Sequence, residues 1–99
     1  MNETDPRLIR LAEQDNVLMV ARTLAEGETV QVAGRSIAIR QLLSLGHKLA
    51  ASDIKEGETI TKYNFPIGVA TQDIAFGEHV HIHNARSDYT ANYVVPEAS

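Results

Sequence analysis

IKEGETI at residues 54–60 has two close variants elsewhere in the chain, LAEGETV at residues 24–30 and IAFGEHV at residues 74–80. Each copy has an aliphatic residue, two variable residues, a Gly-Glu pair and, one residue later, a second aliphatic residue. An Asp or Thr before the copy can cap a single helical turn, the first aliphatic side chain fills the core, and the glycine allows a turn with positive φ. The residues after the glutamate then begin a strand. Three copies predict a β domain built from repeated turn-and-strand units.

The segments between these turns have the pattern of short strands. Apolar or alternating runs predict strands at residues 17–20, on either side of Ala33-Gly34, from Ile60 onward, at residues 65–70 and at residues 80–82. Only residues 41–45 favour a helical turn, which Gly46 would end. The predicted fold class is therefore mostly β, a compact barrel or clip with short helical turns.

The chain length limits both the number of domains and the chemistry. Ninety-nine residues are enough for one small domain, which we place at residues 1–86, and residues 87–99 have little periodicity and are expected to form an extended carboxy-terminal tail. A domain of this size buries only about two-thirds of the surface of its unfolded chain, which leaves little room for a deep cavity. Catalysis by the chain alone is therefore not expected.

The composition excludes several classes of protein. Nine Lys and Arg against thirteen Asp and Glu give a net charge of −4, which argues against binding nucleic acid through its phosphates. The chain lacks the uncharged apolar run of about 18 residues that spans a membrane, and its first residues show no secretory signal, so the cytoplasm is the expected compartment. The sequence has no Cys, so any metal must be held by histidine or by oxygen ligands.

Three of the four histidines lie in the window EHVHIHN at residues 78–84, where they alternate with aliphatic residues. On a strand, alternate side chains share a face about 7 Å apart, so His79, His81 and His83 would line one side while the aliphatic residues face the core. Such imidazoles could hold Fe, Mn or Zn, contact an anion without a metal, or form only a polar face. We predict His81 and His83 as the ligands, because His79 directly follows the Gly-Glu turn and could be needed to hold it.

Basic residues lie near the same loops. His47 and Lys48 follow Gly46, and Lys62 follows the second repeat. With the histidine window and Arg86, they could present a local cationic pocket in an acidic domain, since Lys and Arg bind carboxylates through charge-assisted hydrogen bonds. An ordinary exposed side chain is the alternative at each position. The sequence shows no nucleophile elbow, phosphate-binding glycine loop or dinucleotide fingerprint.

Two longer stretches resemble a known family. GHKLAASDIKEG at residues 46–57 and ITKYNFPIGVATQDIAFGEHVHIHN at residues 60–84 look like the amino-terminal domain of the altronate and galactarate dehydratase family, and residues 15–17 resemble the start of that domain's first buried strand. The resemblance extends from about residue 8 to residue 86. It implies an SAF domain with a β-clip fold, in which Asp-Ile-x-x-Gly-Glu turns recur. This agrees with the fold expected from the repeats.

The resemblance also implies a function. Members of the family are hydro-lyases that remove water from sugar acids to give 2-keto-3-deoxy acids, typically with iron(II) or a similar divalent metal such as manganese. A related branch, the sulfolactate sulfo-lyases, eliminates sulfite and is built from a small and a large subunit. We therefore expect the small subunit of a sugar-acid dehydratase, inactive without a large catalytic subunit that could itself hold most of the metal. The alternatives are a sulfo-lyase subunit and a non-catalytic module that binds a sugar acid. The sequence is also compatible with a homo-oligomer.

The chemistry of this elimination assigns provisional roles to the residues. The developing enediolate needs electrostatic stabilisation, and the leaving hydroxyl needs a proton or a Lewis acid. Histidine can ligate a metal or transfer a proton near neutral pH. The predicted catalytic residues, which are also the predicted metal ligands, are His81 and His83. The predicted substrate contacts are His47, Lys48, Lys62, Asn84 and Arg86.

Overall fold

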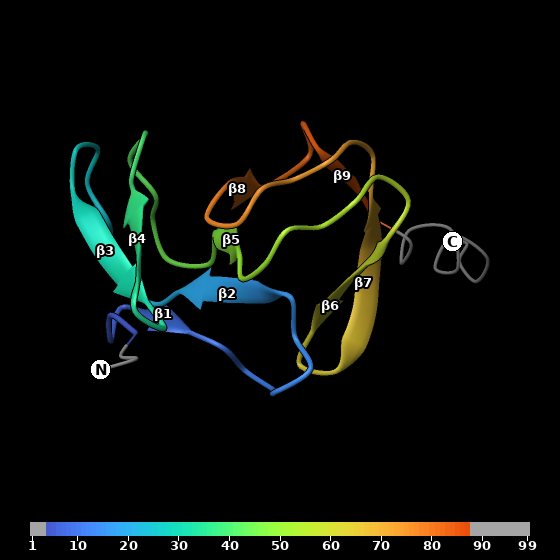
Figure 1. Cartoon of the computed structure of the whole chain (residues 1–99), viewed down its shortest axis with the longest axis horizontal. Coiled ribbons are helices and arrows are strands. Elements are labelled where there is room, and N and C mark those ends of the chain that lie inside the picture. Colours follow the sequence, from blue (N-terminus) through green and yellow to red (C-terminus); the bar gives the residue numbers. More distant parts are fainter. Residues whose placement is uncertain (1–3, 88–99) are drawn as a thin grey trace, which may run out of the picture.

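The structure is a computed structural model that describes residues 4–87, and in this part of the chain short strands form three antiparallel sheets (Figure 1). The central sheet contains, in spatial order, β1 (Leu8–Ile9), β2 (Val17–Val20), β5 (Lys48–Ala50) and β8 (His79–Val80). The hairpin of β3 (Thr29–Val32) and β4 (Arg35–Ala38) lies at one end of the molecule. The sheet of β6 (Thr59–Lys62), β7 (Phe65–Ala70) and β9 (Ala85–Arg86) lies at the other end. The mostly β fold class predicted from the sequence is confirmed. The predicted tail from residue 88 onward lies outside the described residues.

The repeated turns pair with one another beside each of the two hairpins. Leu24 pairs with Leu43 beside the first hairpin, and Ile54 pairs with Ile74 beside the second, each through an isolated antiparallel bridge. All four of these side chains are buried. The aliphatic residue that opens each turn therefore both fills the core and fixes one turn against another.

The helical turn expected at residues 41–45 is wrong, and the segment is instead a fourth copy of the glycine turn. LSLGHKL at residues 43–49 has the same shape, with Gly46 at a φ of 96° and the His47 N–H donating to the Ser44 carbonyl over 3.2 Å. Leu43 exchanges both of its backbone hydrogen bonds with Leu24, which leaves none for a helix. Residues 4–87 contain no helix, and hence none that could cross a membrane.

The two hairpins make the chain an internal repeat with a period of about thirty residues. Both reverse direction through two consecutive residues with positive φ, Ala33-Gly34 in the first hairpin and Tyr63-Asn64 in the second. Each hairpin contributes to its own buried aliphatic cluster. The second half differs from the first in its third strand, β9, and in a register shift between Ile60 and Thr61 in the pairing of β6 with β7. This bulge adds one residue to the second half.

Asp15 holds the tip of the second hairpin. Its buried carboxylate accepts hydrogen bonds from the backbone N–H groups of Tyr63 (2.7 Å), Asn64 (2.9 Å) and Ala12 (3.0 Å). Burial opposes ionisation of this carboxyl, but the three donors outweigh burial and lower its pKa. Asp15 thus offsets the cost of a positive φ at two residues that are not glycine, and it fixes the end of the strand that carries Lys62.

Candidate metal and anion site

The histidine window leaves the sheet after two residues. Strand β8 ends at Val80, and the chain from His81 to Asn84 forms a turn in which the Asn84 N–H donates to the His81 carbonyl over 3.1 Å. The predicted alternation along one strand is therefore wrong beyond Val80. Ile82, which would have faced the core, is 83% exposed.

Asn84 causes this change of direction. Its side-chain oxygen accepts the His81 N–H over 3.0 Å, and its side-chain nitrogen donates to the His79 carbonyl over 2.9 Å. These bonds occupy backbone groups that a longer strand would need for pairing. Asn84 is only 1% exposed, so the structure places this predicted substrate contact inside the turn, where it orients His79 and His81.

Three histidines meet where the fourth glycine turn lies beside β8. His47 Nδ1 lies 2.9 Å from His79 Nε2, and the rings of His79 and His81 are stacked with their centroids 5.3 Å apart. One ligand nitrogen from each of His47, His79 and His81 lies within 4.8 Å of the others. Pairing of Leu49 with His79 in the central sheet places the two segments side by side.

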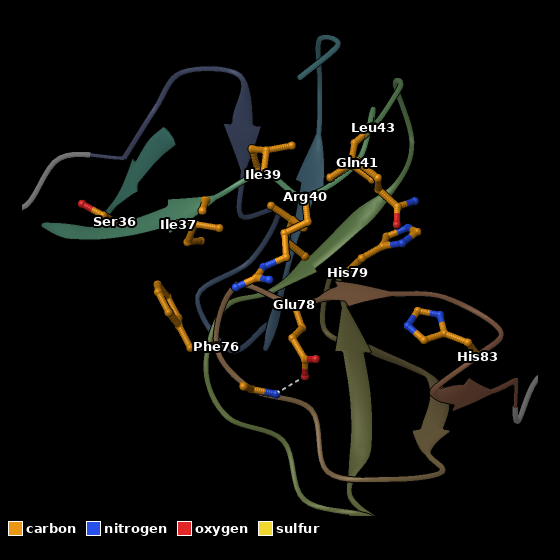
Figure 2. Close-up of a pocket in the computed structure, with 14 residues that line it drawn as sticks. Ser36, Ile37, Ile39, Arg40, Gln41, Leu43, Phe76, Glu78, His79 and His83 are labelled. Atoms are coloured by element: carbon orange, nitrogen blue, oxygen red, sulfur yellow. Dashed lines mark hydrogen bonds between the residues drawn. The ribbon is translucent and has the colours of Figure 1, made fainter. Parts of the chain in front are cut away.

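His83 lies outside this group. Its ring centroid lies 5.8 Å from that of His79, and the planes of the two rings are tilted by 40° to each other. Figure 2 shows His79 and His83 along one side of a hollow of about 550 Å³, with Phe76 toward its opposite end. Arg40, Gln41 and Glu78 also line this hollow. The structure thus brings together His81 with His47 and His79, whereas His83 faces a neighbouring space.

Lys48, Lys62 and His81 share a second hollow, a groove of about 890 Å³. None of the described residues that line this groove is acidic, although the chain as a whole is. Burial, and then the charge of Lys62, lower the pKa of Lys48. A bound carboxylate would relieve this repulsion, so the groove suits an anion at its basic end. Its remaining wall includes the exposed side chains of Tyr63, Phe65 and Ile82.

Arg86 is placed differently from the two lysines. It lies on the edge strand β9, paired with Val69, and its side chain is exposed. The neighbours Ala85 and Ser87 line the groove, whereas Arg86 does not. Of the predicted substrate contacts, the structure therefore gathers Lys48 and Lys62 beside His81.

His79 is the most perturbed group of the site. Burial and then the neighbouring imidazoles, His47 foremost, lower its pKa to about 4. The ring is therefore neutral at physiological pH, the form that ligates metals. The sequence favours His81 and His83 over His79 and predicts His47 as a substrate contact, whereas the structure places both His47 and His79 beside His81. The signal that could have found the pair is the fourth repeat, in which His47 occupies the position of the repeated glutamate.

Comparison with known proteins defines the class to which this fold and site belong. The family described as Altronate/galactarate dehydratase SAF domain matches residues 6–88, so the chain belongs to that family, as the resemblance predicted. It is 45% identical over 80 residues to an altronate dehydratase of Bacillus subtilis (strain 168) and 44% identical over 80 residues to one of Escherichia coli (strain K12).

The matches to the altronate dehydratases cover most of this chain but only a small part of each relative. Both matches to altronate dehydratases include 81% of this chain but only 16% of the relative. The chain is also 45% identical over 49 residues, half of its length, to a (2R)-sulfolactate sulfo-lyase subunit alpha of Chromohalobacter salexigens, of which the match covers 52%. The shared region thus occurs both in long dehydratases and in a protein named as a subunit.

Proposed function

We propose that this chain is the small subunit of a lyase that removes water from a sugar acid and acts together with a larger catalytic polypeptide. The observation that carries the proposal is the groove in which Lys48 and Lys62 lie beside His81. The relatives named as altronate dehydratases support the reaction class. The match to a protein named as an alpha subunit supports the division into two polypeptides.

The proposed roles follow from the chemistry of the elimination. The proton next to the carboxylate is removed, the hydroxyl on the next carbon leaves with a proton as water, and the resulting enol rearranges to the 2-keto-3-deoxy acid. Lys48 and Lys62 bind the carboxylate and stabilise the charge that develops on it. His81 and His83 are exposed imidazoles at the two hollows: His83 can accept or donate a proton, and His81 lines the groove and belongs to the histidine group that can hold a metal.

The residues also fit the divalent metal that the family implies. Three imidazole nitrogens within 4.8 Å of one another form a donor set suited to iron(II) or a similar ion. When bound, such an ion would act as a Lewis acid toward substrate oxygen atoms. The chain's own part is to orient the acid through its lysines and to supply the imidazoles.

A sulfo-lyase subunit is the second candidate function. The observation that favours it is the 45% identity to the sulfolactate sulfo-lyase subunit alpha, which the match covers over half of its length. Loss of sulfite from a carbon next to a carboxylated carbon needs the same stabilised enediolate. The two reactions therefore differ only in the leaving group.

The test is an assay of the chain with and without the large polypeptide of its own organism. We expect the isolated chain to be inactive and the co-purified pair to form 2-keto acid from one member of a panel of aldonates and aldarates. Release of sulfite from sulfolactate by the pair would favour the second candidate. Turnover by the isolated chain, or saturable binding of an aldonate with no activity in any assembly, would contradict the subunit proposal.

Replacement of the catalytic histidines sharpens this test. His81→Ala or His83→Ala should lower the rate of the assembled enzyme about 10²-fold or more, the lower range of general acid–base contributions. Thermal stability should change little, because both side chains are exposed. A sharp fall in melting temperature with an unchanged rate would instead show that these histidines are structural.

A further inference from the structure

We propose that this chain, without any partner, holds one divalent metal ion on His47, His79 and His81, and that the site prefers ions with high affinity for imidazole. The proposal deepens the proposed function and rests on it only for the biological role of the ion. Binding itself is a property of the isolated domain. The proposal replaces the predicted ligand His83 with His47 and His79.

The spacing of the nitrogens supports a shared ion. Two imidazole nitrogens that bind one ion at about 2.1 Å, at adjacent positions, lie about 3 Å apart. His47 Nδ1 and His79 Nε2 are separated by 2.9 Å, close to this separation. His81 offers a third nitrogen within 4.8 Å, so a modest movement of one exposed side chain completes the set.

The fold holds two of the three ligands before any ion arrives. Gly46 makes the turn that presents His47, and backbone pairing of Leu49 with His79 sets the distance between the two segments. Asn84 binds the backbone on both sides of Val80 and so fixes the start of the turn that carries His81. A site organised in this way loses little conformational entropy on binding.

The ligand group contains only histidines. The carboxylate of Glu78 is used within its own turn, where it accepts the Ala75 N–H over 2.6 Å (Figure 2). The three-ligand group therefore consists of imidazoles alone, without a carboxylate. Neutral imidazole favours Fe, Co, Ni, Cu and Zn, whereas Mg²⁺ and Ca²⁺ prefer oxygen ligands. In the series of divalent ions, iron(II) also binds such donors more tightly than manganese.

The ion would lie beside the groove that takes the anion. His81 belongs to the ligand group and also lines the groove with Lys48 and Lys62. A ligand whose carboxylate is held by the lysines can therefore extend toward the ion. The same ion is also close to the hollow on the other side of His79, which His83 lines.

The experiment uses the untagged full chain and Co²⁺ as the probe, because nitrogen-ligated Co²⁺ has visible absorption bands that report its ligands. We expect one Co²⁺ per chain, displaced by Zn²⁺ and not by a large excess of Mg²⁺. His47→Ala, His79→Ala and His81→Ala should each weaken binding by about 10²-fold or more, since even loss of outer contacts around a metal commonly costs 10–100-fold. His83→Ala is the matched control and should bind like the unmodified chain.

Folding of each variant is checked by thermal unfolding, and His47→Asn and His79→Asn provide milder replacements in case the alanine variants unfold. Absence of stoichiometric Co²⁺ binding by the folded, untagged chain would overturn the proposal. So would a result in which His83→Ala abolishes binding while His47→Ala does not. Neither outcome decides the lyase function, which is measured separately with the large polypeptide present.

Discussion

The turn at Gly46 differs from the other three glycine turns in the residue that follows the glycine. At Gly27, Gly57 and Gly77 the next residue is glutamate, whose carboxylate accepts a backbone N–H three residues earlier, over 2.6 to 2.9 Å. At Gly46 the next residue is His47, whose ring instead faces His79. Three turns thus use the side chain to stabilise themselves, whereas the fourth directs it to another strand. A departure from an internal repeat therefore marks the candidate site.

Replacement of the glycines should give the largest difference in stability between the turns. Gly77 has a φ of 86°, and a Cβ added there would lie 2.9 Å from the Ile37 side chain. Gly46 has a φ of 96°, but an added Cβ would meet nothing within 4 Å. Gly77→Ala should cost about 3 kcal/mol, from left-handed strain and overpacking together, and Gly46→Ala about 1 kcal/mol from strain alone.

Urea unfolding of the two variants measures this difference, and Gly57→Ala is the matched control. Gly57 also has a positive φ and no atom within 4 Å of an added Cβ, so its variant should resemble Gly46→Ala. Equal losses at Gly77 and Gly57 would contradict the packing argument, because strain would then account for the whole effect.

Much of the fold could be predicted from the sequence because its signals are local. The Gly-Glu turns, the apolar run of β2 and the Ala33-Gly34 hairpin each depend on neighbouring residues. The helical turn expected at residues 41–45 is wrong because the three leucines of this segment suit a helix locally. What decides its structure is the pairing of Leu43 with Leu24, a contact between distant residues that periodicity does not reveal.

Acid should open the turn at Gly27 more readily than the turn at Gly46. The Ala25 N–H, and then the Arg7 guanidinium, lower the pKa of Glu28 below its ordinary value of 4.5. A lowered pKa means that ionised Glu28 stabilises the fold above the pKa of the unfolded chain, and that this contribution is lost as the pH falls through the lower value. The amide shift of Ala25 should therefore titrate with a midpoint below 4.5.

The fourth turn supplies the comparison for this titration. Ser44 occupies the position of Ala25, and no carboxylate accepts its N–H among the hydrogen bonds of the described residues. Its amide should show no transition in the same acidic range. A similar transition at Ser44 would mean that the two amides report general acid unfolding rather than closure of one turn.

The candidate site was only partly predictable, for a related reason. The window at residues 78–84 could be recognised from composition, and the two lysines could be recognised as basic residues near loops. Their mutual placement could not, because it depends on the Asn84 turn and on the pairing of β5 with β8. These features place Ile82 at the surface and the ring of His47 beside that of His79.

Replacing His47 with the glutamate found in the other three turns should have the smallest effect on stability. In His47→Glu the new carboxylate can accept the Ser44 N–H, as Glu78 accepts the N–H of Ala75, while the contact with His79 is lost. His47→Ala loses the same contact and gains nothing, so the two variants differ mainly by the closing hydrogen bond. One such bond contributes about 1 kcal/mol, and the Glu variant should be more stable than the Ala variant by about that amount in urea unfolding. A downfield shift of the Ser44 amide in the Glu variant alone would show that the bond has formed. Equal stabilities with no shift would mean that His47 occupies a turn that a glutamate cannot close, and the fourth turn would then differ from the other three in its backbone as well as in its side chain.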